Sequence, residues 1–322
     1  MTDLTNSTQY SPTLEFEDRH KIYYGFLHNF SSMNTRKNYF KDLKLFLSFM
    51  RKYFPRISEV RAEHAHIVAF KEFLIGLEGE RKQGRSHRSV NRTLACLFSF
   101  YEYLENLGLV KDNPVRKVRR FKIARRVETM DLTDEQVGLM LQAVDRETLS
   151  GKLHFALLKV LFSTGMRHSE LTQLKFENLD QQGKWIVLHY TAKGEKEMRT
   201  PLHPEAELAL SDYLKACALE GYSMESDDYL FRPTKNSVGG LNKCLDSKSM
   251  SYIFTKYAKS AGVTNRVTPH SARATVIGSL LEKGISIDKV ADFVGHKDMG
   301  TTKSYNKRLS KIENSLSFEL NF

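Results

Sequence analysis

Two arginines in the second half of the chain stand in contexts suited to holding a phosphate group. The segment STGMRHSEL places Arg167 after a glycine turn at an expected helix start, where backbone N–H groups and the helix dipole favour anions. The segment TPHSAR places His270 and Arg273 three residues apart, on one face of a helical turn. Two arginines can hold the non-bridging oxygens of a phosphodiester and offset the charge of a pentacoordinate transition state.

Two further segments supply a proton donor and a nucleophile. Lys193 stands at the apex of a predicted strand pair in TAKGEK, and a lysine can protonate a leaving 5′-oxygen. The segment GHKDMGTTKSY adds His296 and Tyr305, nine positions apart. A phenol has a pKa of about 10, so a tyrosine nucleophile needs a base or a cationic field, which His270 and His296 would provide. A phosphotyrosyl ester conserves the energy of the cleaved bond, so strands could be rejoined without ATP.

Each of these residues alone has an ordinary interpretation, since lone tyrosines and histidines are more often packing or surface residues. The prediction therefore depends on the set. The chemistry requires no metal or other cofactor, and the sequence has no DxD-type cluster, zinc-ligand spacing or GxxxxGK[ST] loop. Cys96, Cys217 and Cys244 are widely spaced, which predicts reduced thiols and neither a disulfide framework nor a zinc site.

The charge of the chain indicates a polyanionic partner. Its 322 residues are 41% hydrophobic, enough for two ordinary domains, and carry a formal charge of +11. Such a surplus favours nucleic acid or an anionic membrane surface. No apolar run approaches the roughly 20 residues that span a bilayer, and the first 20 residues lack the features of a signal peptide. Cytoplasmic residence is therefore the expectation, and the charge alone does not choose between nucleic acid and a membrane surface.

The first half of the chain has the pattern of a helical bundle. Residues 1–15 are polar and are interpreted as a flexible leader, and residues 16–118 form the predicted DNA-binding domain. The segment SSMNTRKNYFKDLKLFLSFM offers Ser32 or Asn34 as an N-cap before an apolar stripe at helical spacing. The segment RSVNRTLACLFSFYEYLENLG repeats this pattern, with Gly108 as the expected C-cap.

Basic residues gather at two places around this bundle. Residues 111–127 carry eight Lys or Arg against one Asp, and we assign 119–128 as a basic linker. Such a run is commonly a solvated connector, but it could also follow a phosphate backbone. A second basic group leads into the segment RSVNRTLACLFSFYEYLENLG and contains no acidic residue. The candidate DNA-binding residues are Arg36, Lys37, Arg85, Arg88, Arg92, Arg119 and Arg120.

Residues 129–322 have the pattern of a second, α-rich domain that contains the candidate site. Thr133 is the expected N-cap of its first helix, with Glu135 in the first turn. The segment GKWIVLHYTAKGEKEMRTPLH predicts two or three short strands, with KGEK as the turn. The expected fold is mainly α, with a small antiparallel sheet in the second domain.

These segments resemble the tyrosine recombinase, or phage integrase, family. STGMRHSEL is similar to the family's first arginine box, HSAR to its H-x-x-R box, and GHKDMGTTKSY to its GH box and nucleophile segment. AKGEKEMRTPL resembles the hairpin that carries the catalytic lysine, and the gaps between the boxes agree. The two helical segments of the first half are similar to the family's SAM-like core-binding domain. The resemblance covers most of the chain.

The resemblance implies a role for each site residue. Tyr305 would attack the scissile phosphate and become linked to the DNA 3′ end. Arg167 and Arg273 would hold the phosphate, and Lys193 would be the general acid. His270 and His296 would assist proton transfer and phosphate contact, whereas Glu170 resembles an acidic residue that supports the first arginine. The family also implies a C-shaped clamp on DNA and a homotetramer that joins two sites through a Holliday junction.

Several functional alternatives stay open at this point. The run after Arg273 departs from the family's common H-T-F-A-T, which favours a recombinase of a mobile element over Xer-type chromosome or plasmid dimer resolution. An inactive DNA-binding accessory protein, a relaxing topoisomerase and a resolvase that forms hairpin telomeres are the other candidates. An accessory or directionality factor is a further expected partner. The tail KIENSLSFELNF packs either on its own chain or on a neighbouring protomer.

Overall fold

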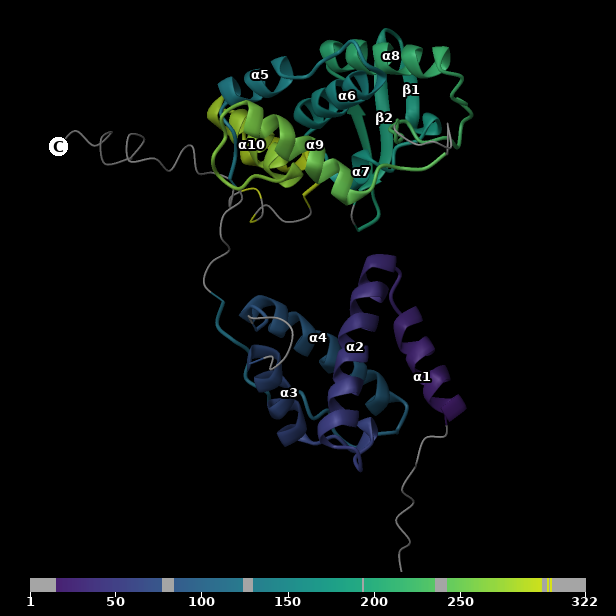
Figure 1. Cartoon of the computed structure of the whole chain (residues 1–322), viewed down its shortest axis with the longest axis vertical. Helices are drawn as coiled ribbons and strands as arrows, with labels where there is room; N and C mark the ends of the chain where they lie inside the picture. Colours follow the sequence, from purple (N-terminus) through teal and green to yellow (C-terminus); the bar gives the residue numbers. More distant parts are fainter. Residues whose placement is uncertain are drawn as a thin grey trace, which may run out of the picture. The chain divides into compact units, whose positions relative to one another are not determined.

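The chain divides into two compact units, residues 1–126 and 127–322, and each is described by itself. The computed structural model describes residues 16–76, 84–123, 130–192, 194–234 and 242–296, together with Gly300 and Thr302. Within those ranges, none of the helices combines the length and the apolar character that crossing a membrane requires. Figure 1 shows helices in both units and strands in the second.

The described part of the first unit contains helices and connecting loops but no strand. Ser32 accepts a hydrogen bond from the Thr35 N–H and is therefore the N-cap, which settles the choice between two predicted caps. Gly108 adopts a φ of +69° two residues after the helix that ends at Asn106, as its predicted capping role requires. The elements are α1 (Phe16–His28), α2 (Met33–Tyr53), η1 (Glu59–Arg61), α3 (His64–Gly76) and α4 (His87–Asn106).

Aromatic rings fill the core of the first unit. Phe26, Phe46, Phe70 and Phe100 are at most 1% exposed and come from four different helices. Phe46 and Phe70 meet edge to face, with ring centroids 5.1 Å apart, and Phe26 and Phe100 do so at 5.2 Å. The helical bundle predicted from the apolar stripes is therefore present, and its core draws on four helices.

The segment after α4 stays on the first unit for longer than a free linker would. Val115 and Val118 are buried in the core of that unit. Further along, Asn91 on α4 exchanges two hydrogen bonds with the backbone of Phe121, and the His87 ring stacks on Phe121 at 4.0 Å. The limits 16–118, 119–128 and 129–322 remain sequence predictions. The described chain leaves the contacts of the first unit only after Phe121.

The second unit is α-rich with one small sheet, as the sequence predicts. Thr133 is the N-cap of its first helix, and Gln136 closes the capping box. The helices are α5 (Asp134–Gln142), α6 (Leu149–Thr164), α7 (His168–Leu171), α8 (Pro204–Leu219), α9 (Ser247–Ser260), α10 (Pro269–Glu282) and α11 (Ile287–Phe293), with η2 (Phe176–Asn178). The strands are β1 (Leu179–Gln182), β2 (Trp185–Ala192) and β3 (Lys196–Pro201).

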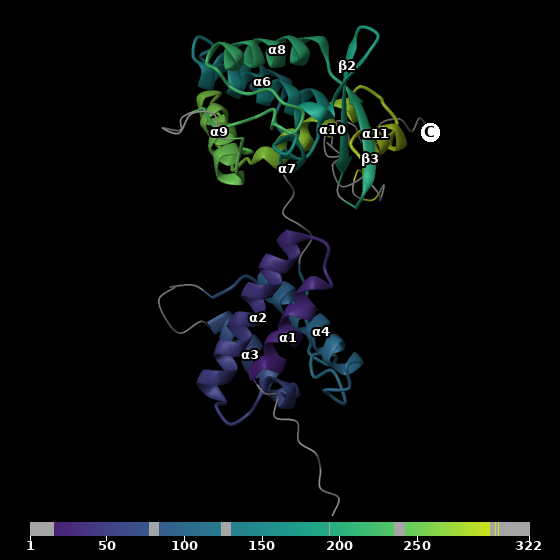
Figure 2. The same ribbon diagram turned by 90° about the vertical axis from the view of Figure 1, so that its right-hand side faces the viewer.

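The sheet is antiparallel, in the order β1-β2-β3. Ala192 pairs with Lys196, so three residues form the turn between β2 and β3. Two of them, Gly194 and Glu195, have φ of 86° and 63°, and this left-handed backbone closes the hairpin. Figure 2 shows the hairpin beside α10 and α11.

Helix α10 is largely buried within the second unit. Its residues from Ser271 to Gly278 are all buried, so neighbouring elements cover it on every side. Thr275 is 3% exposed, and its hydroxyl donates to the Ser271 carbonyl and accepts from the Leu132 N–H at 2.8 Å. This hydroxyl anchors α10 to the segment that leads into α5.

We expect Thr275→Val to lower the free energy of unfolding by about 1–3 kcal/mol, because the buried Leu132 N–H would lose this acceptor. Thr275→Ser keeps the hydroxyl and should lose only about 1 kcal/mol, for one buried methyl group. Urea denaturation of the full chain measures both changes. A valine variant as stable as the wild type would show that this hydrogen bond does not hold α10.

Candidate active site

A buried arginine joins the two turns that carry the other site residues. Arg273, on α10, is 1% exposed. Its Nη1 donates to the carbonyl of Gly165 at 2.9 Å, and its Nη2 donates to the carbonyl of Val294 at 2.5 Å. Gly165 and Val294 are the C-caps of α6 and α11, where carbonyl groups lack partners within the helix. The cation therefore meets the negative ends of two helix dipoles.

Arg167 follows the first of these turns by two residues. Gly165 ends α6 with a φ of +60°, and a Cβ at this position would lie 3.0 Å from Val276, so the turn packs closely on α10. Glu170 then holds Arg167 twice, accepting from its backbone N–H and from Nη1, both at 2.8 Å. The supporting role predicted for Glu170 agrees with this geometry. The Arg167 side chain remains 25% exposed and can reach a ligand.

His296 follows the second turn by two residues. Its backbone N–H donates to the Ala291 carbonyl at 2.8 Å, and its Nδ1 lies 2.8 Å from the hydroxyl of Thr302, which is 0% exposed. A hydroxyl that donates to Nδ1 fixes the tautomer that carries its proton on Nε2. Thr302 was not among the predicted site residues. Its place in the segment GHKDMGTTKSY, three residues before Tyr305, was the available signal.

The β2–β3 hairpin lies against the second turn. Gly295 has a φ of +66°, which favours glycine, and a Cβ there would be 3.1 Å from the Met198 sulfur and 3.8 Å from the Ala192 Cβ. An ion pair of 2.7 Å between Lys196 and Asp292 joins the same hairpin to α11. Lys193 lies outside the described residues. Ala192, directly before it in the sequence, lies next to Gly295.

His270 is the second residue of α10 and is half-buried, one helical turn before Arg273. The structure thus brings Arg167, Arg273 and His296 to one place through the two carbonyl contacts, with His270 on the same helix as Arg273. Tyr305 and the tail KIENSLSFELNF lie outside the described residues. Among those described, no group of three His, Cys, Asp or Glu side chains could hold a metal ion.

Tyr190 on β2 is a second tyrosine within the electrostatic range of the site. Its pKa is raised, chiefly by burial and also by the negative charge of Glu170, which together outweigh a hydrogen bond with Thr200 and the positive charges of Arg273 and Arg167. Its hydroxyl therefore stays protonated and neutral. The sequence pattern marked Tyr190 only as a strand residue, since nothing in its spacing connects it with the two arginines.

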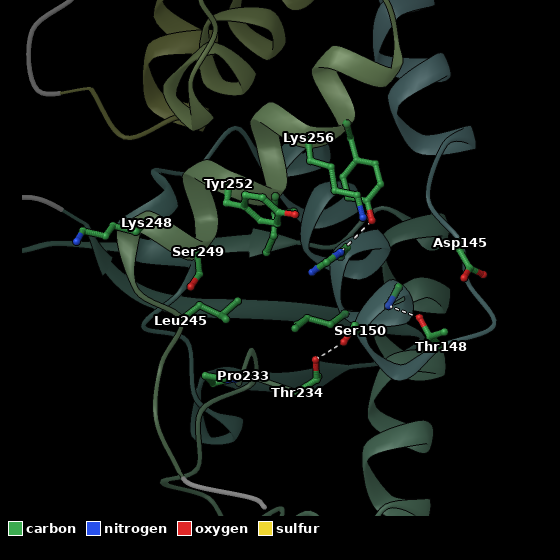
Figure 3. Close-up of a pocket in the computed structure, with 15 residues that line it drawn as sticks. Asp145, Thr148, Ser150, Pro233, Thr234, Leu245, Lys248, Ser249, Tyr252 and Lys256 are labelled. Carbon is green, nitrogen blue, oxygen red and sulfur yellow. Dashed lines mark hydrogen bonds between the residues drawn. The ribbon is translucent and has the colours of Figure 1, made fainter. Parts of the chain in front are cut away.

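A cavity of about 650 Å³ lies elsewhere in the second unit, between the first turns of α6 and helix α9. Figure 3 shows its lining, with a hydrogen bond between Ser150 and Thr234. Lys248, Tyr252 and Lys256 line it from α9. It is not lined by any described residue of the candidate site, so the phosphate chemistry is not assigned to it.

The basic candidates of the first unit differ in their contacts. Lys37, Arg88, Arg119 and Arg120 are exposed. Arg36 donates from Nε to the Phe30 carbonyl at 2.5 Å. Arg85, just before α4, and Arg92, on α4, form ion pairs with a buried carboxylate, Asp42 on α2. The sequence group that includes them contains no acidic residue, so this partner was not expected.

Comparison with known proteins agrees with the fold and the motifs. Residues 130–311 match the phage integrase family, and residues 26–108 match the phage integrase N-terminal SAM-like domain. The tyrosine recombinase XerD of Listeria innocua is 32% identical over 278 residues, which cover 85% of this chain and 88% of that protein.

Solved structures show the same fold at lower identity. The XerH site-specific recombinase in a post-cleavage complex with its palindromic difH substrate matches with a TM-score of 0.69 and 18% identity, over 90% of this chain and 81% of that one. The lambda integrase tetramer bound to a Holliday junction matches with a TM-score of 0.64 and 18% identity, over 91% of this chain and 78% of that one. From the family match and the XerD relative, this chain belongs to the phage integrase family of tyrosine recombinases, site-specific enzymes that cleave and rejoin DNA.

Proposed function

We propose that this recombinase cleaves DNA with Tyr305 as its nucleophile, and that the residues around Arg273 form the site for the scissile phosphate. One observation carries the proposal: a single buried guanidinium binds the turn before Arg167 and the turn before His296. Two elements far apart in the sequence thereby present a cation and an imidazole together. The partner is double-stranded DNA that contains a recombination site.

The proposed reaction is a phosphoryl transfer without net hydrolysis. The Tyr305 oxygen forms a bond to phosphorus while the bond to the 5′-oxygen breaks, so the 3′ end is left as a phosphotyrosyl ester. The phenolic proton passes to a base, for which His270 and His296 are the candidates, and Lys193 protonates the leaving 5′-oxygen. A 5′-hydroxyl from a second strand then reverses these steps and rejoins the DNA.

Arg167 and Arg273 would contribute differently to phosphate binding. Arg167 is partly exposed, with one end of its guanidinium fixed by Glu170, which orients a bidentate donor before DNA arrives. Arg273 is deeply buried and already donates to two carbonyls, although a guanidinium has five N–H groups. We propose that Arg273 sets the geometry of the site and adds charge behind the phosphate.

We propose a homotetramer on two DNA sites as the working assembly, by analogy with the lambda integrase tetramer on a Holliday junction. The XerD relative supports the Xer-type resolution of chromosome or plasmid dimers, while the departure after Arg273 favours a mobile element. The proposed place of action is the cytoplasm, at the nucleoid. An accessory or directionality factor would choose between integration, excision and resolution.

We expect Tyr305→Phe to abolish covalent cleavage and leave DNA affinity within about twofold, because only the nucleophilic oxygen is removed. The full chain is incubated with a nicked recombination site taken from DNA beside its own gene, and adducts stable in SDS are separated on a gel. A wild-type adduct that is absent in the phenylalanine variant supports the proposal. An adduct that persists in the variant would assign the nucleophile to another residue.

We expect Thr302→Val to slow cleavage of the same nicked site by about tenfold or more, because His296 would lose the hydroxyl that fixes its tautomer. Thr302→Ser keeps the hydroxyl and should restore most of the rate. The pH profile of single-turnover cleavage should shift in the valine variant and return in the serine variant. Equal rates and pH profiles for the wild type and both variants would show that the Thr302 hydroxyl does not orient His296 for cleavage.

We expect Arg88→Ala to weaken binding equally for specific and unrelated duplexes, and to reduce the slope of log Kd against log salt by about 1. Lys215→Ala on α8 removes the same charge from an exposed position in the second unit and should leave the slope nearly unchanged. Fluorescence anisotropy across a salt series measures both variants. Unchanged slopes in Arg88→Ala would mean that α4 does not face the DNA backbone.

A further inference from the structure

A fully buried carboxylate lies beneath the basic residues of the first unit. Asp42, on α2, is 0% exposed, and α2 packs against α4, which carries Arg88 and Arg92 (Figure 1). An aspartate is rarely buried without partners, since removing its charge from water is costly. Its partners therefore indicate why the first unit keeps it.

One oxygen of this carboxylate accepts three hydrogen bonds. The Asp42 Oδ1 accepts from Arg92 Nη2 at 3.0 Å, from the Thr93 hydroxyl at 3.1 Å and from Arg85 Nη1 at 3.2 Å. Arg85 Nη1 also reaches the Thr93 hydroxyl at 3.1 Å. Thr93 is itself 0% exposed. The Thr93 hydroxyl also lies 3.2 Å from the Ser89 carbonyl, and Asp42 Oδ2 is buried with no hydrogen-bond partner within the described residues. The one aspartate and two arginines of the group carry a net charge of +1.

The network holds both arginines at one end only. In the described part of the chain, each guanidinium uses one terminal nitrogen on Asp42, and the Arg85 and Arg92 side chains remain 24% and 48% exposed. A long arginine side chain loses rotamer entropy when it is fixed. Two arginines that are already oriented lose less of it when they bind a phosphate.

We propose that Asp42 is a positioning residue that orients Arg85 and Arg92 to bind the DNA backbone. The inference rests on the proposed function, because it takes the first unit to bind the duplex. Asp42 itself is buried and does not touch DNA; it acts through the two guanidinium groups. Thr93 serves the same network through its hydroxyl.

The negative charge of Asp42 allows the proposal to be tested by the direction in which DNA affinity changes. A carboxylate near a phosphate repels it, so removal of the charge alone should tighten DNA binding. If Asp42 orients the arginines, its neutralisation should instead weaken binding, although the protein becomes more positive. The two effects have opposite directions.

The experiment compares Asp42→Asn with Glu102→Gln in the full chain. Glu102 is exposed on α4 and forms no ion pair within the described residues, so its substitution changes the net charge by the same amount. Anisotropy with a duplex recombination site across a salt series gives Kd and the salt slope. We expect Asp42→Asn to bind about tenfold more weakly with a slope reduced by about 1, and Glu102→Gln to bind as the wild type or slightly more tightly.

A second variant addresses the case in which Asp42→Asn unfolds the first unit. Thr93→Val removes one hydroxyl from the network with no change in net charge, and the residue is too deeply buried to contact DNA. We expect it to weaken binding about threefold while urea denaturation shows a folded protein. Wild-type affinity in both Asp42→Asn and Thr93→Val, or tighter binding in Asp42→Asn, would overturn the proposal.

A double-mutant cycle separates positioning from a purely structural role. In an Arg85→Ala, Arg92→Ala background, Asp42→Asn should change the affinity by less than about twofold, because the residues through which it acts are gone. A full loss in that background would assign Asp42 to folding alone and overturn the proposal. The covalent-adduct assay on the wild type tests the proposed function separately, because it reports Tyr305 chemistry and not the orientation of these arginines.

Discussion

The second unit depends on one buried cation between two helix ends. Arg273 donates to the carbonyls of Gly165 and Val294, so the C-termini of α6 and α11 are held at a fixed separation. Each turn then continues into a residue of the candidate site, Arg167 on one side and His296 on the other. A buried guanidinium is tolerated because it is paired with carbonyls that would otherwise lack partners. The fold and the site therefore share the same interaction.

Other side-chain contacts surround Arg273 in the second unit. Glu170 fixes Arg167, Thr302 fixes His296, and the Lys196–Asp292 ion pair joins the hairpin to α11. Contacts of this kind orient side chains before a ligand binds, and such preorganisation lowers the barrier to reactions that depend on alignment. In the first unit, Asp42 occupies a comparable place under two arginines. In both units, arginine side chains are paired with buried or partly buried carboxylates.

The sequence predicted the elements better than the contacts between them. Caps such as Ser32 and Thr133, and the strand pattern of β2, depend on neighbours a few residues away, so local rules identify them. The spacing of the motifs likewise identified the polar residues that resemble the family's site. The bond from Asp42 to Arg92 joins residues 50 positions apart, and a basic group without nearby acids gave no sign of it. Tyr190 was missed for the same reason, because only folding brings β2 near the arginines.

The central claim is that the arginine-linked turns serve a tyrosine nucleophile, and peptide mapping of the covalent complex tests it most directly. The wild-type adduct on a nicked site would be trimmed with nuclease, digested with protease and analysed by tandem mass spectrometry. The account predicts a nucleotide attached to the phenolic oxygen of Tyr305. A nucleotide on any other residue, Tyr190 included, would contradict it.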